Sequence, residues 1–137
     1  MTDRELLNLA LEARKTSYAP YSNYRVGAAL LCADGKIYTG SNVENASYSA
    51  TICAERSAFA AAASAGERNF TAIAVAGGKG EKAEEAAPPC GVCRQVMAEF
   101  CKEDFKIILG NEDTFKTYCL ADLLPLSFDA GNLGENR

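Results

Sequence analysis

The sequence predicts an α/β fold in which three layers, α/β/α, surround a mixed five-stranded sheet. Two observations lead to this prediction. The 137 residues are enough for one compact domain with a buried core. The expected elements follow the order α-β-β-α-β-α-β-β, and a β-hairpin followed by two helical crossovers gives a sheet with helices on both faces. No repeat or second domain is visible, so we expect residues 1–137 to form a single domain, with a frayed polar tail over 131–137.

The N-terminal elements are a helix and a hairpin. Thr2-Asp3-Arg4-Glu5 has the form of a capping box, and it predicts a helix over Asp3–Ser17. A short apolar run predicts a strand over Arg25–Cys32. The turn signal Asp34-Gly35 then predicts an antiparallel return over Lys36–Gly40.

The rest of the chain alternates loops with helices and strands. The polar segment Asn42–Ser49 is expected to be a loop, and the Ala-rich segment after it a helix that starts near Thr51–Cys53 and ends at Ala65 before Gly66. The later elements are predicted as a strand over Phe70–Ala76, a loop over Gly77–Ala87, a helix from Cys90 to about Lys102, strands over Lys106–Leu109 and Phe115–Cys119, and a helical turn over Ala121–Leu124.

Composition and charge exclude several classes of function. The chain has no His, which removes Ser-His-Asp and Cys-His catalysis. Its net charge is −4 and no basic patch stands out, so we expect neither a nucleic-acid polymer nor a membrane as partner. The N-terminal residues carry no apolar leader, so the six Cys are expected to stay reduced in the cytoplasm.

Three cysteines have the spacing of a metal site. Cys53 precedes Glu55 by two residues, and a distant segment supplies Pro89-Cys90-Gly91-Val92-Cys93. Without His, thiolates must hold any zinc, and three protein ligands with one open position are typical of catalytic zinc. We therefore expect one Zn²⁺ per chain on Cys53, Cys90 and Cys93.

Two other interpretations of the Cys pair stay open. Cys90 and Cys93 could form a redox dithiol, or half of a structural zinc site with a fourth Cys. The available candidates sit in apolar patterns that favour buried packing, namely Cys32, Cys101 and Cys119.

Glu55 is the expected acid/base group. The pattern C-x-E…P-C-x-x-C is the all-Cys form of the zinc deaminase signature. Glu55 would accept a proton from a zinc-activated water and deliver it to the ring nitrogen of a pyrimidine, while attack at C4 expels ammonia. Taken alone, Glu55 would be a helix-start acid that complements the dipole. Arg56 is expected to donate to the ligand sulfurs, and its alternative is a solvated surface position.

Polar and aromatic residues outside this motif suggest a substrate pocket. Asn42 and Glu44 suit a sugar with free hydroxyls, although loop capping by Asn is the common alternative. Tyr24 and Phe128 are candidates to lie against a base or sugar, although such aromatics are more often core.

Together these segments resemble the small cytidine deaminases. The resemblance runs from the first helix to Phe128 and rests on five motifs: Tyr21-Ser22-x-Tyr24-x-Val26-Gly27-Ala28-Ala29-Leu30, Asn42-Val43-Glu44-Asn45-Ala46-Ser47-Tyr48, Cys53-Ala54-Glu55-Arg56, Pro89-Cys90-Gly91-x-Cys93-Arg94-Gln95 and Leu123-Leu124-Pro125-x-x-Phe128. It implies that cytidine and deoxycytidine are deaminated to uridine and deoxyuridine in pyrimidine salvage. It also implies a homotetramer with shared active sites.

The resemblance also implies roles for individual residues. The backbone around Ala54 would meet the amide edge of the base, and Gln95 would support the ligands alongside Arg56. Tyr48 and Phe128 would reach a site from adjacent chains. The family usually has Phe where this chain has Tyr24, and the added hydroxyl needs a partner or water.

Three competing functions share parts of this pattern. An aminonucleoside-antibiotic deaminase would keep C-x-E and P-C-x-x-C, but the segment Asn42–Tyr48 favours an ordinary nucleoside. A polynucleotide-editing deaminase would need a basic groove. A non-catalytic zinc-stabilised interaction module would need a fourth protein ligand in place of water.

Overall fold

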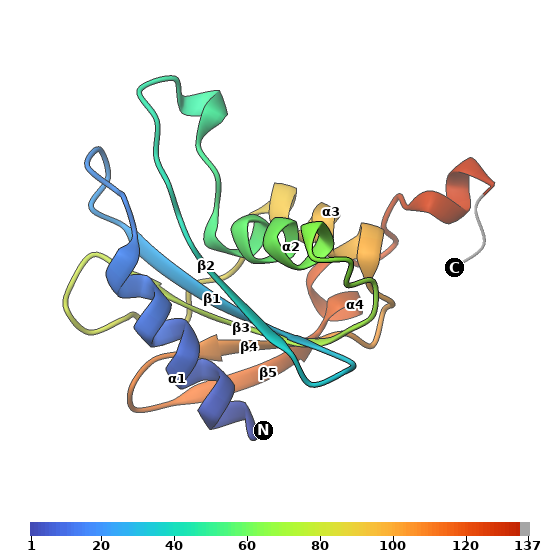
Figure 1. Ribbon diagram of the computed structural model, residues 1–137, viewed down its shortest axis with the longest axis horizontal. Helices are drawn as coiled ribbons and strands as arrows, with labels where there is room; N and C mark the ends of the chain where they lie inside the picture. Colours follow the sequence, from blue (N-terminus) through green and yellow to red (C-terminus); the bar gives the residue numbers. More distant parts are fainter. Residues whose placement is uncertain (135–137) are drawn as a thin grey trace.

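The computed structural model describes residues 1–134, and its centre is a five-stranded sheet in the order β2-β1-β3-β4-β5 (Figure 1). The strands are β1 (Arg25–Cys32), β2 (Ile37–Ser41), β3 (Phe70–Gly78), β4 (Lys106–Gly110) and β5 (Phe115–Cys119). The helices are α1 (Asp3–Ala13), α2 (Ala54–Ser64), α3 (Gly91–Phe100) and α4 (Leu120–Leu123). Short 3-10 helices are η1 (Arg14–Thr16), η2 (Tyr48–Ala50) and η3 (Ala130–Leu133). None of the helices in residues 1–134 has the length and apolarity that crossing a bilayer requires.

The sheet is mixed, as the sequence predicts. β1 pairs antiparallel with β2 and with β3, and β4 pairs antiparallel with β5. Only β3 and β4 run parallel, and α3 lies in the connection between them. Parallel neighbours need such a crossover, whereas the Asp34-Gly35 turn joins β1 directly to β2.

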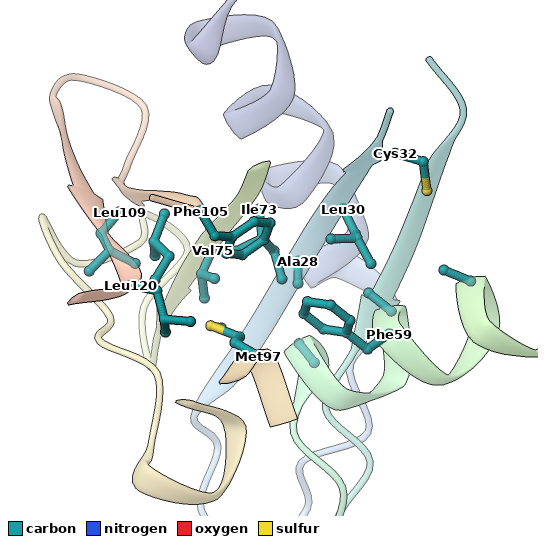
Figure 2. Packing of buried hydrophobic residues seen from close by; sticks show 14 residues of the cluster. Ala28, Leu30, Cys32, Phe59, Ile73, Val75, Met97, Phe105, Leu109 and Leu120 are labelled. Carbon is teal, nitrogen blue, oxygen red and sulfur yellow. The ribbon is translucent and has the colours of Figure 1, made fainter. Parts of the chain in front are cut away.

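Helices cover both faces of the sheet, which confirms the three-layer prediction. Alternate residues of each strand point to opposite faces. On one face, Leu6, Leu7 and Ala10 of α1 pack in a cluster with Ala74 and Ile108. The other face packs against α2 and α3, as Figure 2 shows for Phe59 and Met97 below the strands, in a cluster whose labelled strand residues are Ala28, Leu30, Cys32, Ile73, Val75 and Leu109.

The first helix ends earlier than predicted. Its capping box at Thr2 and Glu5 is present, but the α-helix stops at Ala13 and η1 replaces the last turn. Thr16 Oγ1 donates to the Ala13 carbonyl at 2.9 Å, which satisfies a carbonyl left free at the helix end. Ser17 is then extended, so the predicted end at Ser17 is wrong by one turn.

The C-terminal segment has more local structure than a frayed tail. Over 130–133 it forms η3, where Asp129 accepts a hydrogen bond from the Gly131 N–H at 2.9 Å. The remainder of the predicted tail, residues 135–137, lies outside the described residues. Figure 1 shows η3 standing away from the sheet.

Glycines let two helices approach the sheet closely enough to place the site. A Cβ on Gly40 of β2 would lie 2.6 Å from the Ala54 carbonyl oxygen, so only glycine admits the start of α2 there. A Cβ on Gly27 of β1 would lie 2.0 Å from the Ala10 carbonyl oxygen and 2.4 Å from the Arg14 nitrogen. α2 and η1 are therefore held directly against β2 and β1.

Candidate metal centre

The two segments of the cysteine motif meet at the starts of two helices. Cys53 is the N-cap of α2 and Cys90 the N-cap of α3, while Cys93 lies in the first turn of α3. Their sulfur atoms all lie within 4.8 Å of one another, and Cys53 Sγ is 3.7 Å from Cys90 Sγ. The sequence prediction that these three residues come together is therefore matched by the geometry.

The cluster suits a tetrahedral zinc ion. Thiolates at the usual Zn–S distance of about 2.3 Å and tetrahedral angles have sulfurs about 3.8 Å apart, close to the 3.7 Å between Cys53 and Cys90. Cys93 is buried, Cys53 is half-buried and Cys90 is exposed, so the cluster opens toward solvent on one side. Within residues 1–134 no fourth cysteine joins this group.

Local charge favours a thiolate at Cys53. The pKa of Cys53 is lowered to about 5, because the Cys93 thiol, then Arg56 and Cys90, donate hydrogen bonds to its sulfur. The pKa of Cys93 is raised, because its proton is shared with Cys53 and its side chain is buried. Arg56 Nη2 lies 3.5 Å from Cys53 Sγ and 3.3 Å from the Thr51 carbonyl oxygen. Its Nε is buried with no hydrogen-bond partner in the described chain, so the guanidinium has donor capacity to spare beside the sulfurs.

Glu55 is the buried carboxyl of the site. It is 4% exposed and lies in the first turn of α2. Burial raises its pKa to about 7, and the neighbouring Cys53 thiolate adds to the rise. A carboxyl in this setting can both accept and release a proton near neutral pH.

A second group of possible ligands already has a cation beside its two carboxylates. Cys32, Asp34 and Glu67 also place their ligand atoms within 4.8 Å of one another. However, Lys36 Nζ lies 3.9 Å from Asp34 and 4.0 Å from Glu67, and Tyr38 donates to Glu67 at 3.2 Å. This group therefore forms a surface ion-pair network, and the three-cysteine cluster is the better metal site.

A cavity of about 210 Å³ opens beside the sulfur cluster. Glu55 and two of the cysteines line it together with several residues singled out in the sequence. The lining includes Ser22, Tyr24, Asn42, Glu44, Cys53, Ala54, Glu55, Ala87, Pro88 and Cys90. Cavities of about 500 Å³ and 340 Å³ lie elsewhere, and neither is lined by a complete group of metal ligands from the described residues.

Asn42 and Glu44 lie in the cavity wall with part of their hydrogen-bonding capacity already used. The Asn42 amide oxygen accepts from the Val26 N–H at 2.9 Å and from the Ser17 hydroxyl, and its Nδ2 donates to the Tyr24 carbonyl at 2.8 Å. One amide N–H of Asn42 is left for a ligand. Asn42 thus holds the start of β1 as well as facing the cavity.

The Glu44 carboxylate is held by the loop before β1. It accepts from the backbone N–H groups of Tyr21 and Ser22 at 2.9 and 3.2 Å, and from the Ser22 hydroxyl at 2.5 Å. These bonds, led by that from Ser22, lower the pKa of Glu44, so the side chain is an ionised acceptor. The cavity therefore offers a fixed anion for hydroxyl groups.

Tyr24 and Ala54 are two further predicted site residues that border the cavity. Ala54 is fully buried at the first position of α2. Tyr24 is partly buried, and burial, followed by the charge of Glu84, raises its pKa. Its hydroxyl is therefore neutral at physiological pH.

Five predicted site residues do not line this cavity: Cys93 and Arg56, which belong to the sulfur cluster, and three others that lie away from it. Tyr48 is 76% exposed and lines a neighbouring surface hollow with Tyr21 and Glu44. Phe128 is 61% exposed on the C-terminal segment. Gln95 is also exposed, and its Nε2 donates to the Phe128 carbonyl at 2.7 Å. Gln95 therefore holds the Phe128 segment and not the cysteine sulfurs.

Two further residues support the site without having been singled out in the sequence. Ser22 holds Glu44, as described above. Arg94 donates through Nε to the Pro89 carbonyl and through Nη1 to the Leu123 carbonyl, each at 2.7 Å. It thereby ties the residue before Cys90 to α4. Its position next to Cys93 was visible, but a bond to a distant backbone carbonyl leaves no pattern in the sequence.

Comparison with known proteins places the chain among deaminases. Residues 1–109 match the family model described as the cytidine and deoxycytidylate deaminase zinc-binding region. A cytidine deaminase of Halalkalibacterium halodurans is 45% identical over 135 residues, covering 97% of this chain and 99% of the relative. A cytidine deaminase of Sporosarcina psychrophila is 44% identical and covers 97% of this chain and 96% of the relative.

A solved structure agrees with both the sequence and the fold. The crystal structure of a cytidine deaminase from Burkholderia pseudomallei superimposes with a TM-score of 0.86 at 46% identity, covering 93% of this chain and all of the other. A more distant relative, a blasticidin-S deaminase of Bacillus cereus, is 29% identical over 130 residues, which is 92% of this chain and 91% of the relative.

Proposed function

The chain belongs to the cytidine and deoxycytidylate deaminase family, and we propose that it hydrolyses cytidine and deoxycytidine to uridine and deoxyuridine with release of ammonia. One observation carries the proposal: the three-cysteine cluster and the buried carboxyl of Glu55 border the same cavity as Asn42 and Glu44. Metal ligands, a proton carrier and sugar-binding groups are thus available to one small ligand.

The metal is a single zinc ion held by Cys53, Cys90 and Cys93. The spacing of the sulfurs and the absence of a fourth cysteine from the group in residues 1–134 support three protein ligands and one open position. When bound, zinc supplies Lewis-acid activation of a water molecule. Arg56 and the starts of α2 and α3 offset the negative charge of the three thiolates.

Glu55 carries the protons. Its carboxylate takes a proton from the attacking water and passes it to the ring nitrogen next to the reacting carbon. After water has added at C4, the same carboxylate takes the remaining hydroxyl proton and passes it to the amine, so that ammonia leaves as the C4 carbonyl forms. Its burial keeps solvent from exchanging that proton during the reaction.

The remaining cavity residues orient the nucleoside. Glu44 accepts from sugar hydroxyls while Ser22 and the two backbone N–H groups keep its carboxylate in place. Asn42 adds its one unused amide N–H. The backbone at Ala54 meets the amide edge of the base, and the Tyr24 ring lies against the pocket wall.

A spectrophotometric assay tests the proposal directly. The zinc-loaded protein, mixed with cytidine or deoxycytidine, should give the absorbance decrease that marks conversion to the uracil product. Protein stripped with a chelator serves as control, and its activity should return on addition of zinc but not of magnesium. Lack of turnover of both nucleosides by the zinc-loaded protein would refute the function.

An antibiotic nucleoside is the second candidate substrate. The similarity to a blasticidin-S deaminase is its specific support, but at 29% identity it is weaker than that to the cytidine deaminases at 45%. The same assay with blasticidin S as substrate should give a kcat/KM well below that for cytidine. The reverse order would make the antibiotic the substrate.

The cellular setting belongs to the same proposal. All six cysteines are free, which fits a reducing compartment, so we place the enzyme in the cytoplasm. The proposed conversion of cytidine to uridine places it in pyrimidine salvage. The exposed apolar side chains of Tyr48, Leu126, Phe128 and Leu133 support burial against other copies of the chain in a homotetramer.

A further inference from the structure

The connection between β3 and α3, residues 79–90, forms one wall of the nucleoside cavity. It contains neither helix nor strand, yet Ala87 and Pro88 line the cavity and Cys90 is a candidate ligand. Figure 1 shows it leaving the end of β3 beside the C-terminal end of α1. The shape of the pocket therefore depends on how this β3–α3 connection is held.

Arg14 holds the start of this connection from the opposite face of the sheet. It is 7% exposed and lines neither the nucleoside cavity nor the metal cluster. Its Nη2 donates to the carbonyls of Gly78, at 2.6 Å, and Gly80, and its Nη1 donates to that of Glu81 at 2.8 Å. Its Nε donates to the Arg25 carbonyl at 2.9 Å, which ties the same group to the start of β1.

The carbonyls that Arg14 binds lie next to the pocket wall. A Cβ on Gly77 would lie 3.1 Å from the Ala87 Cβ and 3.3 Å from Tyr24 Cε1, so the Tyr24 ring and Ala87 converge above Gly77. Gly78, whose carbonyl Arg14 binds, is the next residue. Gly78, which Arg14 binds, and Gly77, above which Tyr24 and Ala87 converge, are thus joined by one peptide unit.

A second set of bonds fixes the middle of the connection. The buried Asn111 side chain donates to the Ala83 carbonyl at 3.0 Å, and the Ala83 N–H donates to Glu112 at 3.2 Å. The Glu84 N–H donates a hydrogen bond to the Gly77 carbonyl at 2.8 Å. Arg14 is therefore the part of this network that joins the connection to β1, the strand that begins directly after Tyr24.

We infer that Arg14 is a positioning residue for the nucleoside pocket, which sets the distance between Tyr24 and the wall formed by Ala87 and Pro88. The inference rests on the proposed function, since the pocket it shapes is that of the nucleoside. Arg14 touches neither substrate nor metal, so its loss weakens binding of the ground state and of the transition state alike. Such a change raises KM and leaves kcat nearly unchanged.

The test compares Arg14→Met with Arg14→Lys in the zinc-loaded enzyme. Met keeps the bulk and removes every donor, whereas Lys keeps the charge and part of the hydrogen bonding. We expect Arg14→Met to raise KM for cytidine by about tenfold while kcat changes by less than about threefold. The KM of Arg14→Lys should lie between those of Arg14→Met and wild type.

Hydrogen exchange gives a readout that is independent of catalysis. Without substrate, amides of residues 78–87 should exchange faster in both variants, while peptides from β4 and α2 keep the wild-type rate. Lys15→Met is the matched control. It cuts the contact of Lys15 with Glu12, in which both side chains are more than half exposed, and it should leave KM and exchange unchanged.

Each outcome decides the inference. An unchanged KM, an equal loss in kcat, or faster exchange over the whole fold would overturn it, because Arg14 would then be a general stabiliser. If Arg14→Met does not fold, Arg14→Lys is judged by the same measurements. If wild type fails to turn over cytidine, the proposed function fails. Faster exchange confined to residues 78–87 in the variants would still show that Arg14 holds the β3–α3 connection.

Discussion

Three functional side chains come from four consecutive residues, Cys53 to Arg56. Residues two positions apart on a regular helix do not share a face. Cys53 and Glu55 nevertheless both line the cavity. The backbone explains this, because Cys53 is the N-cap, with the extended angles φ −76° and ψ 157°, and only Ala54 begins the helix. The change of direction at the cap lets both side chains face one ligand.

Replacing Glu55 by Gln should separate catalysis from folding. The amide has nearly the same shape but cannot carry a proton between water and base, so kcat for cytidine should fall by about a thousandfold. Because burial already disfavours the charged carboxylate, the variant should unfold at the wild-type temperature or above it. Rates come from the absorbance assay, stability from thermal unfolding and zinc content from metal analysis.

The exposed Glu103 provides the matched control for this substitution. Glu103→Gln removes the same charge far from the cavity lining and should leave kcat unchanged. Substantial activity in Glu55→Gln at full zinc content would remove Glu55 from the proton path.

Two helix starts bring the ligands together. Both N-caps, Cys53 and Cys90, lack a side-chain hydrogen bond to the helix, although the first N–H groups of a helix need partners. These free N–H groups and the helix dipoles favour negative charge on the sulfurs. The metal site thus depends on how closely α2 and α3 are seated on the sheet.

Gly40→Ala should disturb the seating of α2. The added Cβ would lie 2.6 Å from both the Ala54 carbonyl oxygen and the Ala58 nitrogen, and neither backbone atom can move without the helix. We expect a loss of about 1–3 kcal/mol of stability. In thermal unfolding this should lower Tm by about 5 °C or more.

Gly91→Ala tests whether the added methyl group by itself causes the loss of stability expected for Gly40→Ala. The same methyl meets nothing within 4 Å at Gly91, the first residue of α3. This variant should keep or slightly raise Tm, since Gly→Ala at an unstrained position favours folding. Equal Tm values for both variants would show that close approach at Gly40 does not hold α2.

In the whole chain, two residues that the sequence places in the pocket lie apart from the cavity. Tyr48 and Phe128 lie outside the cavity, and Phe128 stands on the C-terminal segment that Figure 1 shows apart from the sheet. The side chain of Leu126, two residues earlier, is fully exposed. A shared site in a homotetramer would bury these groups.

Mixing two defective variants tests for shared sites. Phe128→Ala should lower activity, because its ring would no longer close a neighbour's pocket, and Glu55→Gln should be nearly inactive. If Phe128 and Glu55 act in one site from different chains, subunit exchange between these variants should restore activity well above that of either alone.

Glu55→Gln mixed with Glu44→Gln is the control for this experiment. Both residues line the cavity of the same chain, so this mixture should regain far less activity than the first. Light scattering on each sample gives the assembly size. No recovery in the first mixture, or an active monomer, would contradict the shared site.

The order and pairing of the elements could be predicted because their signals are local. The Asp34-Gly35 turn and the Thr2 capping box each lie within a few residues, and both are present in the structure. The early end of the first helix was missed, because it involves the Thr16 hydroxyl, which also bonds Ser41 of β2. Such a distant partner leaves no periodic pattern.

The residue types and their spacing are enough to specify the chemistry of the centre. A chain without His, with Cys53 two residues before Glu55 and with Cys90 and Cys93 three apart, offers thiolates as zinc ligands and a carboxyl as proton carrier. What holds that chemistry in place depends on the fold. Arg14 binds the Gly80 and Glu81 carbonyls of the β3–α3 connection, and Arg94 that of Pro89. Backbone carbonyls are the same at every residue, so only the fold selects which of them a buried arginine can reach.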